Sequence, residues 1–202
     1  MRVDALSVGE LQVNCYILSS SQTGNAVIID PGDDYPKIKS FLEKHKLNPK
    51  FIVHTHGHID HIQADDEFGL AVYAHKLDVE LLKDPDKNLS NFLSFPFKVN
   101  SPVKPLEDAE IITLDDISLE TIHTPGHTPG GICLKAGNVV FTGDTLFAGS
   151  IGRTDFPGAS SKQLIKSIKD RLLTLPDETL VYPGHGPSSS IGEEKRENPF
   201  LK

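Results

Sequence analysis

The run His54–His61 places four histidines and one aspartate within eight residues, directly after an apolar segment. Imidazole and carboxylate are the ligands of open, catalytic zinc and iron sites. Residues two apart in an extended segment project to the same side, so His56 and His58 can converge on one ion. Asp60 and His61 follow where the chain is expected to turn into a helix, whose dipole would help to fix Asp60. The spacing predicts two neighbouring metal sites supplied by one loop.

Three further candidate ligands follow short apolar, β-branched runs in loops rich in Gly and Pro. They are His127 in TPGHTPG, Asp144 in FTGDTLF and His185 in YPGHG. Runs bounded by Gly and Pro predict strands, so each candidate is expected at a strand exit, and neighbouring glycines let the backbone pass close to a crowded ion centre. Each residue alone is typical of a turn, and the first cluster alone is compatible with a solvated turn that chelates metal by accident. The whole set favours a metal centre.

The two cysteines do not supply ligands of the structural zinc type. Cys15 and Cys133 are far apart in the sequence, so nitrogen and oxygen must hold the metal. Both lie in strand-like segments and are interpreted as small core residues rather than nucleophiles. Unpaired cysteines fit a reducing compartment.

The ordered motifs HxHxDH, TPGHTPG, FTGDTLF and PGHG resemble the metallo-β-lactamase superfamily, and within it the glyoxalase II-like (hydroxyacylglutathione hydrolase-like) branch. The resemblance extends over nearly the whole chain, from Asn14-Cys15-Tyr16 to Asn198-Pro199-Phe200. It implies an α/β fold, namely a four-layer αββα sandwich of two mixed sheets with outer helices. A flavodiiron-type relative would carry glutamate in place of His58, so the resemblance favours a hydrolase-like site.

The resemblance also implies a ligand set for two divalent metal ions. The first ion is assigned His56, His58 and His127, the second Asp60, His61 and His185, with Asp144 between the two. The family pattern does not use His54 as a ligand. Zinc is the first choice of metal, and iron or manganese are compatible because histidine and aspartate bind all three.

The elements that must position these loops alternate between strands and amphipathic helices. Strand-like segments are expected near 2–8, 13–19, 25–29, 51–55, 70–73, 109–113, 118–122, 131–135, 138–142 and 179–182. Apolar stripes predict two helices, one marked by Ile38, Phe41, Leu42 and His45 and the other by Leu164, Ile168 and Leu172. His45 and His75 fall outside the ligand loops and are interpreted as ordinary surface or helix-boundary histidines.

The segment 84–108 is rich in Pro, Asn and Ser and carries Phe92, Phe95 and Phe97. A loop of that length in a compact domain is often functional, so a flap over the active-site cleft is one interpretation. The other is a packed surface loop buried by its aromatic side chains.

Composition agrees with one hydrolase domain over residues 1–202, since 38% hydrophobic content at this length supports one sizeable core. A net charge of -8 disfavours a nucleic-acid partner, which would need a basic surface. The N-terminus has no apolar signal region and no stretch is long enough to span a bilayer. We therefore expect a cytoplasmic protein with no membrane partner, and the sequence leaves its oligomeric state open.

The expected chemistry is hydrolysis of a small-molecule thioester such as S-lactoylglutathione by a metal-bound hydroxide. Zinc lowers the pKa of bound water to about 7, and two ions can hold the nucleophile and the carbonyl oxygen. Asp60 would orient the nucleophile and Asp144 would set the spacing of the ions. A thiol with a pKa of about 8.5 leaves as thiolate without protonation, so a thioester suits the site better than a lactam.

Substrate contacts are expected from basic residues. Arg153 follows the Asp144 loop and can grip a carboxylate, unless it forms a salt bridge with Asp155. The glyoxalase II family uses a basic residue here for glutathione, but has tyrosine where this chain has Asp155 and Pro187, and its C-terminal glutathione-binding domain is missing here. Further candidate contacts are Lys195 and Arg196, although a solvated terminal helix also explains them. Weaker or different glutathione recognition is expected.

Two alternatives remain. The run Arg153-Thr154-Asp155-Phe156 also resembles persulfide dioxygenases, iron enzymes of the same fold that bind one iron through the counterparts of His56, His127 and Asp144. The other alternative, a non-enzymatic metal- or RNA-binding scaffold, is disfavoured by the intact ligand set and the acidic composition.

Overall fold

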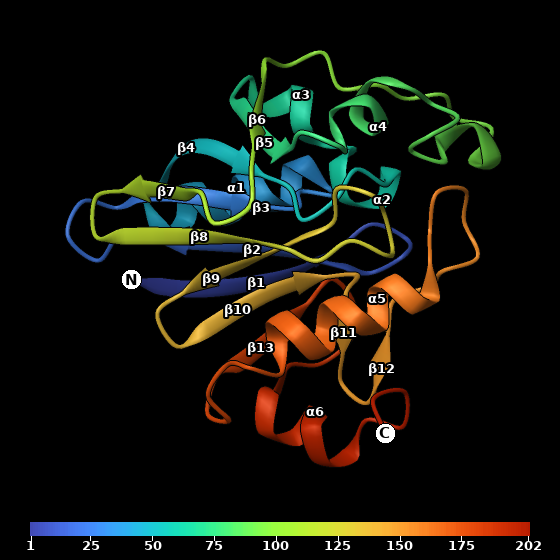
Figure 1. Ribbon diagram of the computed structural model, residues 1–202. Helices are drawn as coiled ribbons and strands as arrows, with labels where there is room; N and C mark the ends of the chain where they lie inside the picture. The colour runs from blue at the N-terminus through green and yellow to red at the C-terminus, as the bar shows by residue number, and fades with distance from the viewer.

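Two six-stranded sheets form the centre of the computed structural model, which describes residues 1–202 (Figure 1). The strands of the first sheet follow chain order: β1 (Arg2–Val8), β2 (Val13–Ser19), β3 (Asn25–Ile29), β4 (Asn48–Val53), β5 (Ala71–His75) and β6 (Val103–Leu106). The β1–β2 and β2–β3 pairs are antiparallel, and the pairs from β3 to β6 are parallel.

The second sheet is also mixed. Its strands, in spatial order, are β14 (Ser189–Ser190), β13 (Leu180–Pro183), β10 (Val139–Gly143), β9 (Ile132–Ala136), β8 (Ile117–His123) and β7 (Ile111–Leu114). Only the β10–β13 pair is parallel. A small hairpin of β11 (Leu146–Phe147) and β12 (Ser150–Ile151) follows β10.

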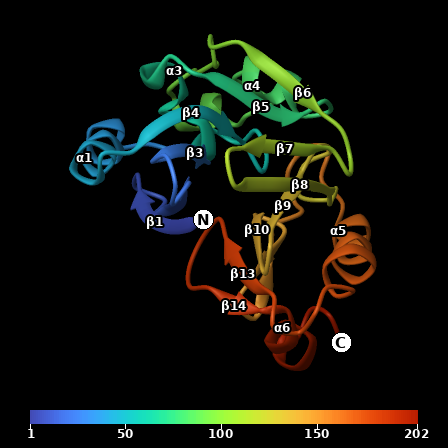
Figure 2. The same ribbon diagram turned by 90° about the vertical axis from the view of Figure 1, so that its left-hand side faces the viewer.

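Helices cover the outer face of each sheet (Figure 2). On the first sheet lie α1 (Tyr35–His45), α2 (Ile59–Ile62), α3 (Asp65–Phe68) and α4 (Val79–Lys83), followed along the chain by the 3-10 turn η1 (Ser90–Leu93). On the second lie α5 (Ser161–Ser167), the continuing π-helical turn η2 (Ile168–Leu172) and α6 (Ile191–Glu197). Ser160 and Ser190 cap α5 and α6 by accepting backbone N–H bonds from Gln163 and Glu193.

Alternation of apolar side chains along the strands produces the layers. In β2, Cys15 and Ile17 face the core beneath α1, whereas Tyr16 and Leu18 face the core between the two sheets. A third core lies between the second sheet and α5, η2 and α6. Because each buried aliphatic or aromatic side chain contributes about 1.5–3 kcal/mol, both faces of both sheets must be covered. The fold is therefore the four-layer αββα sandwich that the sequence predicts.

Strand direction brings the loops of interest to one edge. In the second sheet, β8 and β10 are both antiparallel to β9, and β10 is parallel to β13, so β8, β10 and β13 end at the same edge. In the first sheet, β1, β3, β4 and β5 share one direction by the same reasoning. The two edges meet where Val13, at the start of β2, pairs with His185 after β13.

The ten expected strands and both striped helices lie within a few residues of their predicted positions, whereas the two-residue strands β11, β12 and β14 were not predicted and the segment 84–108 was described incompletely. It contains η1 and the edge strand β6, which pairs in parallel with β5. Pro105 lies within β6 and obscured the strand pattern, although proline is tolerated at a sheet edge. Phe92 and Phe95 are 76% and 54% exposed, so these aromatic side chains do not bury the segment as one interpretation required.

The interpretation of His75 as a surface or boundary residue is wrong. His75 is buried at the end of β5, and its ring stacks on His123 with a centroid separation of 4.0 Å. Cys15 and Cys133 are fully buried, and burial raises the pKa of both thiols, that of Cys133 to about 11, so both belong to the core. No helix reaches the length and apolar character needed to cross a membrane.

Candidate metal centre

Three histidines meet where β4 and β8 end. His56 and His58 lie in the loop between β4 and α2, and His127 lies in the loop between β8 and β9. All three are buried, and one ring nitrogen of each lies within 4.8 Å of the other two. The Nδ1 atom of His58 is 2.9 Å from the Nε2 atom of His127. This group has the geometry to hold one metal ion.

A second group lies beside the first. Asp60 and His61 of α2 and His185 of the loop after β13 also place one ligand atom each within 4.8 Å of one another. Asp144, which follows β10, lies between the groups: its oxygens are 3.4 Å from Nε2 of His61 and 3.6 Å from Nε2 of His127. The structure thus brings together all seven side chains that the sequence analysis proposed as ligands, and their role as ligands stays a prediction.

Three buried atoms of this cluster have no hydrogen-bond partner: Nε2 of His56, Nε2 of His61 and Oδ1 of Asp144. A buried polar atom without a partner costs about 1–3 kcal/mol, and these three belong to one group of possible ligands. A bound cation would satisfy them together. The residues therefore fit a metal centre with nitrogen and oxygen ligands, which suits zinc or iron.

Hydrogen bonds outside the cluster orient three of the rings. Nδ1 of His61 lies 3.0 Å from the carboxylate of Asp30, Nδ1 of His127 lies 2.7 Å from the backbone carbonyl of Arg153, and Nδ1 of His185 lies 3.1 Å from a backbone carbonyl in the β1–β2 turn. Ionised carboxylates and carbonyls only accept hydrogen bonds, so each Nδ1–H must donate. Each Nε2 is then directed at the cluster, which is the tautomer that a metal ligand needs.

The electrostatic environment favours the metal-binding protonation states of four of the seven side chains, whereas burial is outweighed by the neighbouring carboxylates at His61 and His185, whose pKa values are raised, so these two rings must release a proton when metal binds. Burial lowers the pKa of His56 and that of His58, the latter to about 3, so both rings are neutral at neutral pH. Burial alone would raise the pKa of Asp60 and Asp144, but the adjacent His61 lowers both values below the ordinary range. Neutral imidazole and ionised carboxylate are the forms that bind metal.

Asp30 supports the cluster from behind, a role that the sequence analysis did not assign. Its carboxylate accepts hydrogen bonds from the backbone N–H and Oγ1 of Thr55, at 2.8 and 2.6 Å, as well as from His61. His54 lies between Asp30 and Asp65, with Nε2 2.7 Å from Asp65. Burial lowers the pKa of His54, but these carboxylates raise it overall to about 9. His54 is thus engaged outside the cluster, in agreement with its exclusion from the predicted ligand set.

Asp78 joins the two loops that carry the first three histidines, and this role was also missed. Its buried carboxylate accepts hydrogen bonds from the backbone N–H of Gly57 at 3.1 Å, Oγ1 of Thr128 at 2.7 Å and the backbone N–H of Gly130 at 2.6 Å. Asp78 stands at the N-cap position of α4, yet its side chain makes no capping bond. Sequence spacing gives no signal for this contact between distant loops.

The backbone packs closely around the cluster, as the glycines near the ligands predict. A Cβ atom on Gly184 would lie 2.4 Å from Oδ1 of Asp144 and 2.8 Å from Cε1 of His61. A Cβ atom on Gly152 would lie 1.8 Å from the backbone oxygen of Asp144. Glycine is required at both positions because any side chain would displace a candidate ligand.

Comparison with known proteins establishes the family. The model of the metallo-beta-lactamase superfamily matches residues 8–185. The chain belongs to the metallo-β-lactamase superfamily. Hydroxyacylglutathione hydrolase GloC of Haemophilus influenzae is 38% identical, with 100% of this chain and 98% of that protein covered.

Solved structures of the superfamily agree with the fold. BLEG-1, described as a B3 metallo-beta-lactamase, is 37% identical, covers 100% of both chains and has a TM-score of 0.93. TTHA1623 in a di-iron-bound form is 39% identical, covers 98% of this chain and 100% of its own, and has a TM-score of 0.86.

Arg153 lies beside the first group of this superfamily site but is already paired. It donates to both carboxylate oxygens of Asp155, at 3.0 and 2.7 Å, as the competing interpretation stated. Its guanidinium also stacks 4.4 Å from the ring centroid of Phe156, which contacts His58 and His127 edge-on. The Arg153 side chain is 68% exposed and therefore accessible to a substrate. To bind a substrate carboxylate, its guanidinium would have to release Asp155.

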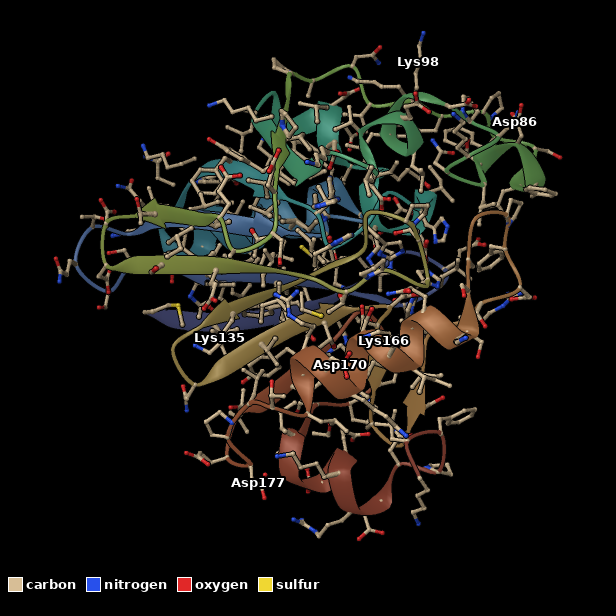
Figure 3. The ribbon with its side chains drawn as sticks, viewed as in Figure 1. Asp86, Lys98, Lys135, Lys166, Asp170 and Asp177 are labelled. Carbon is tan, nitrogen blue, oxygen red and sulfur yellow. The ribbon has the colours of Figure 1, made fainter.

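Lys195 and Arg196 are not brought to the cluster. They lie in α6, where Lys195 pairs with Asp177 at 2.6 Å and donates to the backbone oxygen of Leu175. Figure 3 shows Asp177 near α6, at the end of the molecule away from α2. The competing interpretation, a solvated terminal helix, explains both residues, and neither enters the substrate site proposed below.

Proposed function

We propose that the protein is a metal-dependent hydrolase that cleaves small-molecule thioesters such as S-lactoylglutathione. The observation that carries the proposal is the convergence of seven His and Asp side chains from four loops, with three buried ligand atoms that have no protein partner. The 38% identity with a hydroxyacylglutathione hydrolase over the whole chain supports a thioester as substrate.

Two divalent ions bound there would supply an activated water and a Lewis acid for the carbonyl oxygen. His56, His58 and His127 would hold the first ion, and Asp60, His61 and His185 the second, with Asp144 shared between them. The Asp60 carboxylate is 19% exposed, so it can also accept a hydrogen bond from the attacking water and orient it. The relative in a di-iron-bound form supports iron beside zinc as the metal.

The leaving group distinguishes a thioester from an amide. A thiol with a pKa of about 8.5 departs as thiolate at neutral pH, whereas an amide nitrogen must receive a proton. His61, His127 and His185 each direct Nδ1 at a carboxylate or carbonyl acceptor and Nε2 at the cluster, and Nδ1 of His56 lies 3.2 Å from Oγ1 of Thr55. These rings therefore have no free acid for an amine, which favours the thioester.

The test combines metal analysis of the purified protein with three assays: hydrolysis of S-lactoylglutathione, hydrolysis of a chromogenic β-lactam, and oxygen uptake with glutathione persulfide. We expect close to two metal ions per chain, thioester hydrolysis, and no oxygen uptake. His185→Asn should lose metal and activity together, whereas His45→Asn, on α1 and outside the cluster, should retain both.

Oxygen consumption with a single bound iron would replace the hydrolase by the persulfide dioxygenase alternative. Hydrolysis of the β-lactam without thioester cleavage would overturn the substrate class but keep the hydrolytic reaction. A protein that binds no metal would overturn the whole proposal.

A further inference from the structure

A cavity of about 330 Å³ lies beside the second group of candidate ligands. Its walls are the turn between β1 and β2, the loop between β3 and α1, helix α2, and the end of η1 with the residues that follow it. We propose that this cavity, called here the acyl cavity, binds the acyl arm of the thioester and selects apolar acyl groups over groups that carry a carboxylate. The inference rests on the proposed thioester hydrolysis and adds the class of acyl group.

The acyl cavity is continuous with the candidate metal centre. Asp60 lines the cavity and lies 3.3 Å from Nε2 of His185. Val13 also lines the cavity and pairs with His185 through a β-bridge, and Nδ1 of His185 donates to the backbone oxygen of Leu11, another lining residue. If the thioester carbonyl is held at the metal centre, the acyl cavity therefore lies next to it on the Asp60 side.

The opposite side of the centre has a different character. His58 and His127 of the first group contact Phe156, which carries Arg153 on its face. Arg153 is the basic residue there, and the acyl cavity contains no Lys, Arg or His among its lining residues. The two arms of a thioester placed across the centre would thus meet different surroundings, with the cationic side suited to an anionic thiol such as glutathione.

The lining of the acyl cavity explains its preference for apolar groups. Leu11, Leu93 and Phe95 line it and are 57%, 59% and 54% exposed; single exposed apolar side chains are common, but several gathered at one cavity mark a binding surface. Burial of each additional methylene of an acyl chain against such a surface strengthens binding up to about fourfold. An acyl group longer than lactoyl therefore binds better here.

The charges of the acyl cavity exclude acidic acyl groups. Glu10 and Asp33 line it together with Asp60, and no basic side chain of the lining compensates them. A carboxylate on the acyl group would enter a site of like charge with no cationic partner. The same repulsion disfavours the two carboxylates of glutathione in this cavity and directs them to the Arg153 side.

The experiment compares three glutathione thioesters that differ only in the acyl group: lactoyl, hexanoyl and succinyl. We expect kcat/KM for hexanoyl to exceed that for lactoyl by about tenfold or more, and succinyl to be the poorest substrate. Phe95→Ser should lower the hexanoyl-to-lactoyl ratio at least about threefold, and Glu10→Gln with Asp33→Asn should raise the relative rate for succinyl. Phe92→Ser is the matched control, because Phe92 lies in the same segment, is 76% exposed and does not line the cavity.

Binding of hexanoate and succinate to the metal-loaded protein, followed by calorimetry, gives a readout that does not depend on turnover. Hexanoate should bind and succinate should not, and Phe95→Ser should weaken hexanoate binding where Phe92→Ser does not. Equal kcat/KM for hexanoyl and succinyl thioesters would overturn the acyl-cavity inference while leaving thioester hydrolysis intact. Failure to cleave any of the three thioesters would instead overturn the proposed function.

Discussion

Replacement of Asp78 by asparagine should weaken metal binding although Asp78 is not a candidate ligand. Its carboxylate joins the loop of His56 and His58 to the loop of His127 through three hydrogen bonds of 2.6 to 3.1 Å. Because the two loops supply all three ligands of the first group, their separation depends on this carboxylate. Groups that orient metal ligands from outside typically contribute a factor of about 10–100 to metal affinity.

The size of the effect follows from the geometry. One carboxylate oxygen accepts from Gly57 and Thr128 and the other from Gly130. In Asp78→Asn one oxygen becomes an NH₂ group, so at least one backbone N–H loses its acceptor. A hydrogen bond to a charged group contributes about 1.5–3 kcal/mol. Burial raises the pKa of Asp78, which shows that the buried charge has a desolvation cost, so we expect a loss of about 2 kcal/mol in the free energy of unfolding.

The assay has two readouts. Urea unfolding of the metal-free protein gives the change in stability, and competition with a chelating dye gives the metal affinity. Asp177→Asn is the control, because Asp177 is an exposed carboxylate paired with Lys195, and the change should leave both stability and metal affinity nearly unaltered. If Asp78→Asn is destabilised but binds metal as tightly as the unchanged protein, the role of Asp78 in holding the ligand loops together is refuted.

Three further predictions concern other parts of the molecule. Asp155→Asn should free Arg153 from its exposed ion pair and lower KM for glutathione thioesters by up to about fivefold; an unchanged or higher KM would mean that Arg153 does not contact substrate. Asp144→Asn should lower bound metal and reduce kcat by more than about a hundredfold, and full activity in a metal and turnover assay would rule out its bridging role. Burial and the charge of His123 lower the pKa of His75 from its ordinary value of 6.5 to about 4. As the pH falls, His75 is therefore protonated in the unfolded chain before it is protonated in the folded chain. The stability of the metal-free protein should therefore decrease between pH 6.5 and about 4, and His75→Phe should flatten that part of the curve in urea unfolding; an unaltered curve would contradict the assignment.

The sequence was sufficient for the ligand loops but not for the residues behind them. His56 and His58 are recognised by their alternation after an apolar strand and the later ligands by their Gly- and Pro-rich loops at strand exits, and the resemblance to a family divided them between two ions. Asp30 and Asp78 could not be recognised in the same way. Asp30 stands in an Asp-Pro-Gly run that is typical of a turn, and aspartate is common at a helix N-cap, the position of Asp78, so local chemistry explains both without reference to their distant partners.

The edge strand β6 and the acyl cavity were missed for a related reason. Pro105 interrupts the pattern of β6, and only the pairing with β5 shows that the strand exists. Phe92 and Phe95 look equivalent in the sequence, yet only Phe95 lines the cavity. The surroundings of such side chains depend on how distant segments pack together. No periodicity or spacing in the sequence predicts that packing.

Strand direction explains why the candidate metal centre and the acyl cavity share one edge. Strands β8, β10 and β13 end together in the second sheet, and the turn after β1 lies at the same edge of the first sheet as the end of β4. Each ligand loop thus leaves its sheet at the seam between the two sheets, and the β1–β2 turn leaves beside them. The Val13–His185 bridge joins the two edges directly, so a change in the β1–β2 turn alters both the position of His185 and the wall of the cavity. Substitutions that displace the backbone at Leu11 or Val13 should consequently affect metal affinity and acyl preference together, whereas Phe95, on the other wall, should affect acyl preference alone.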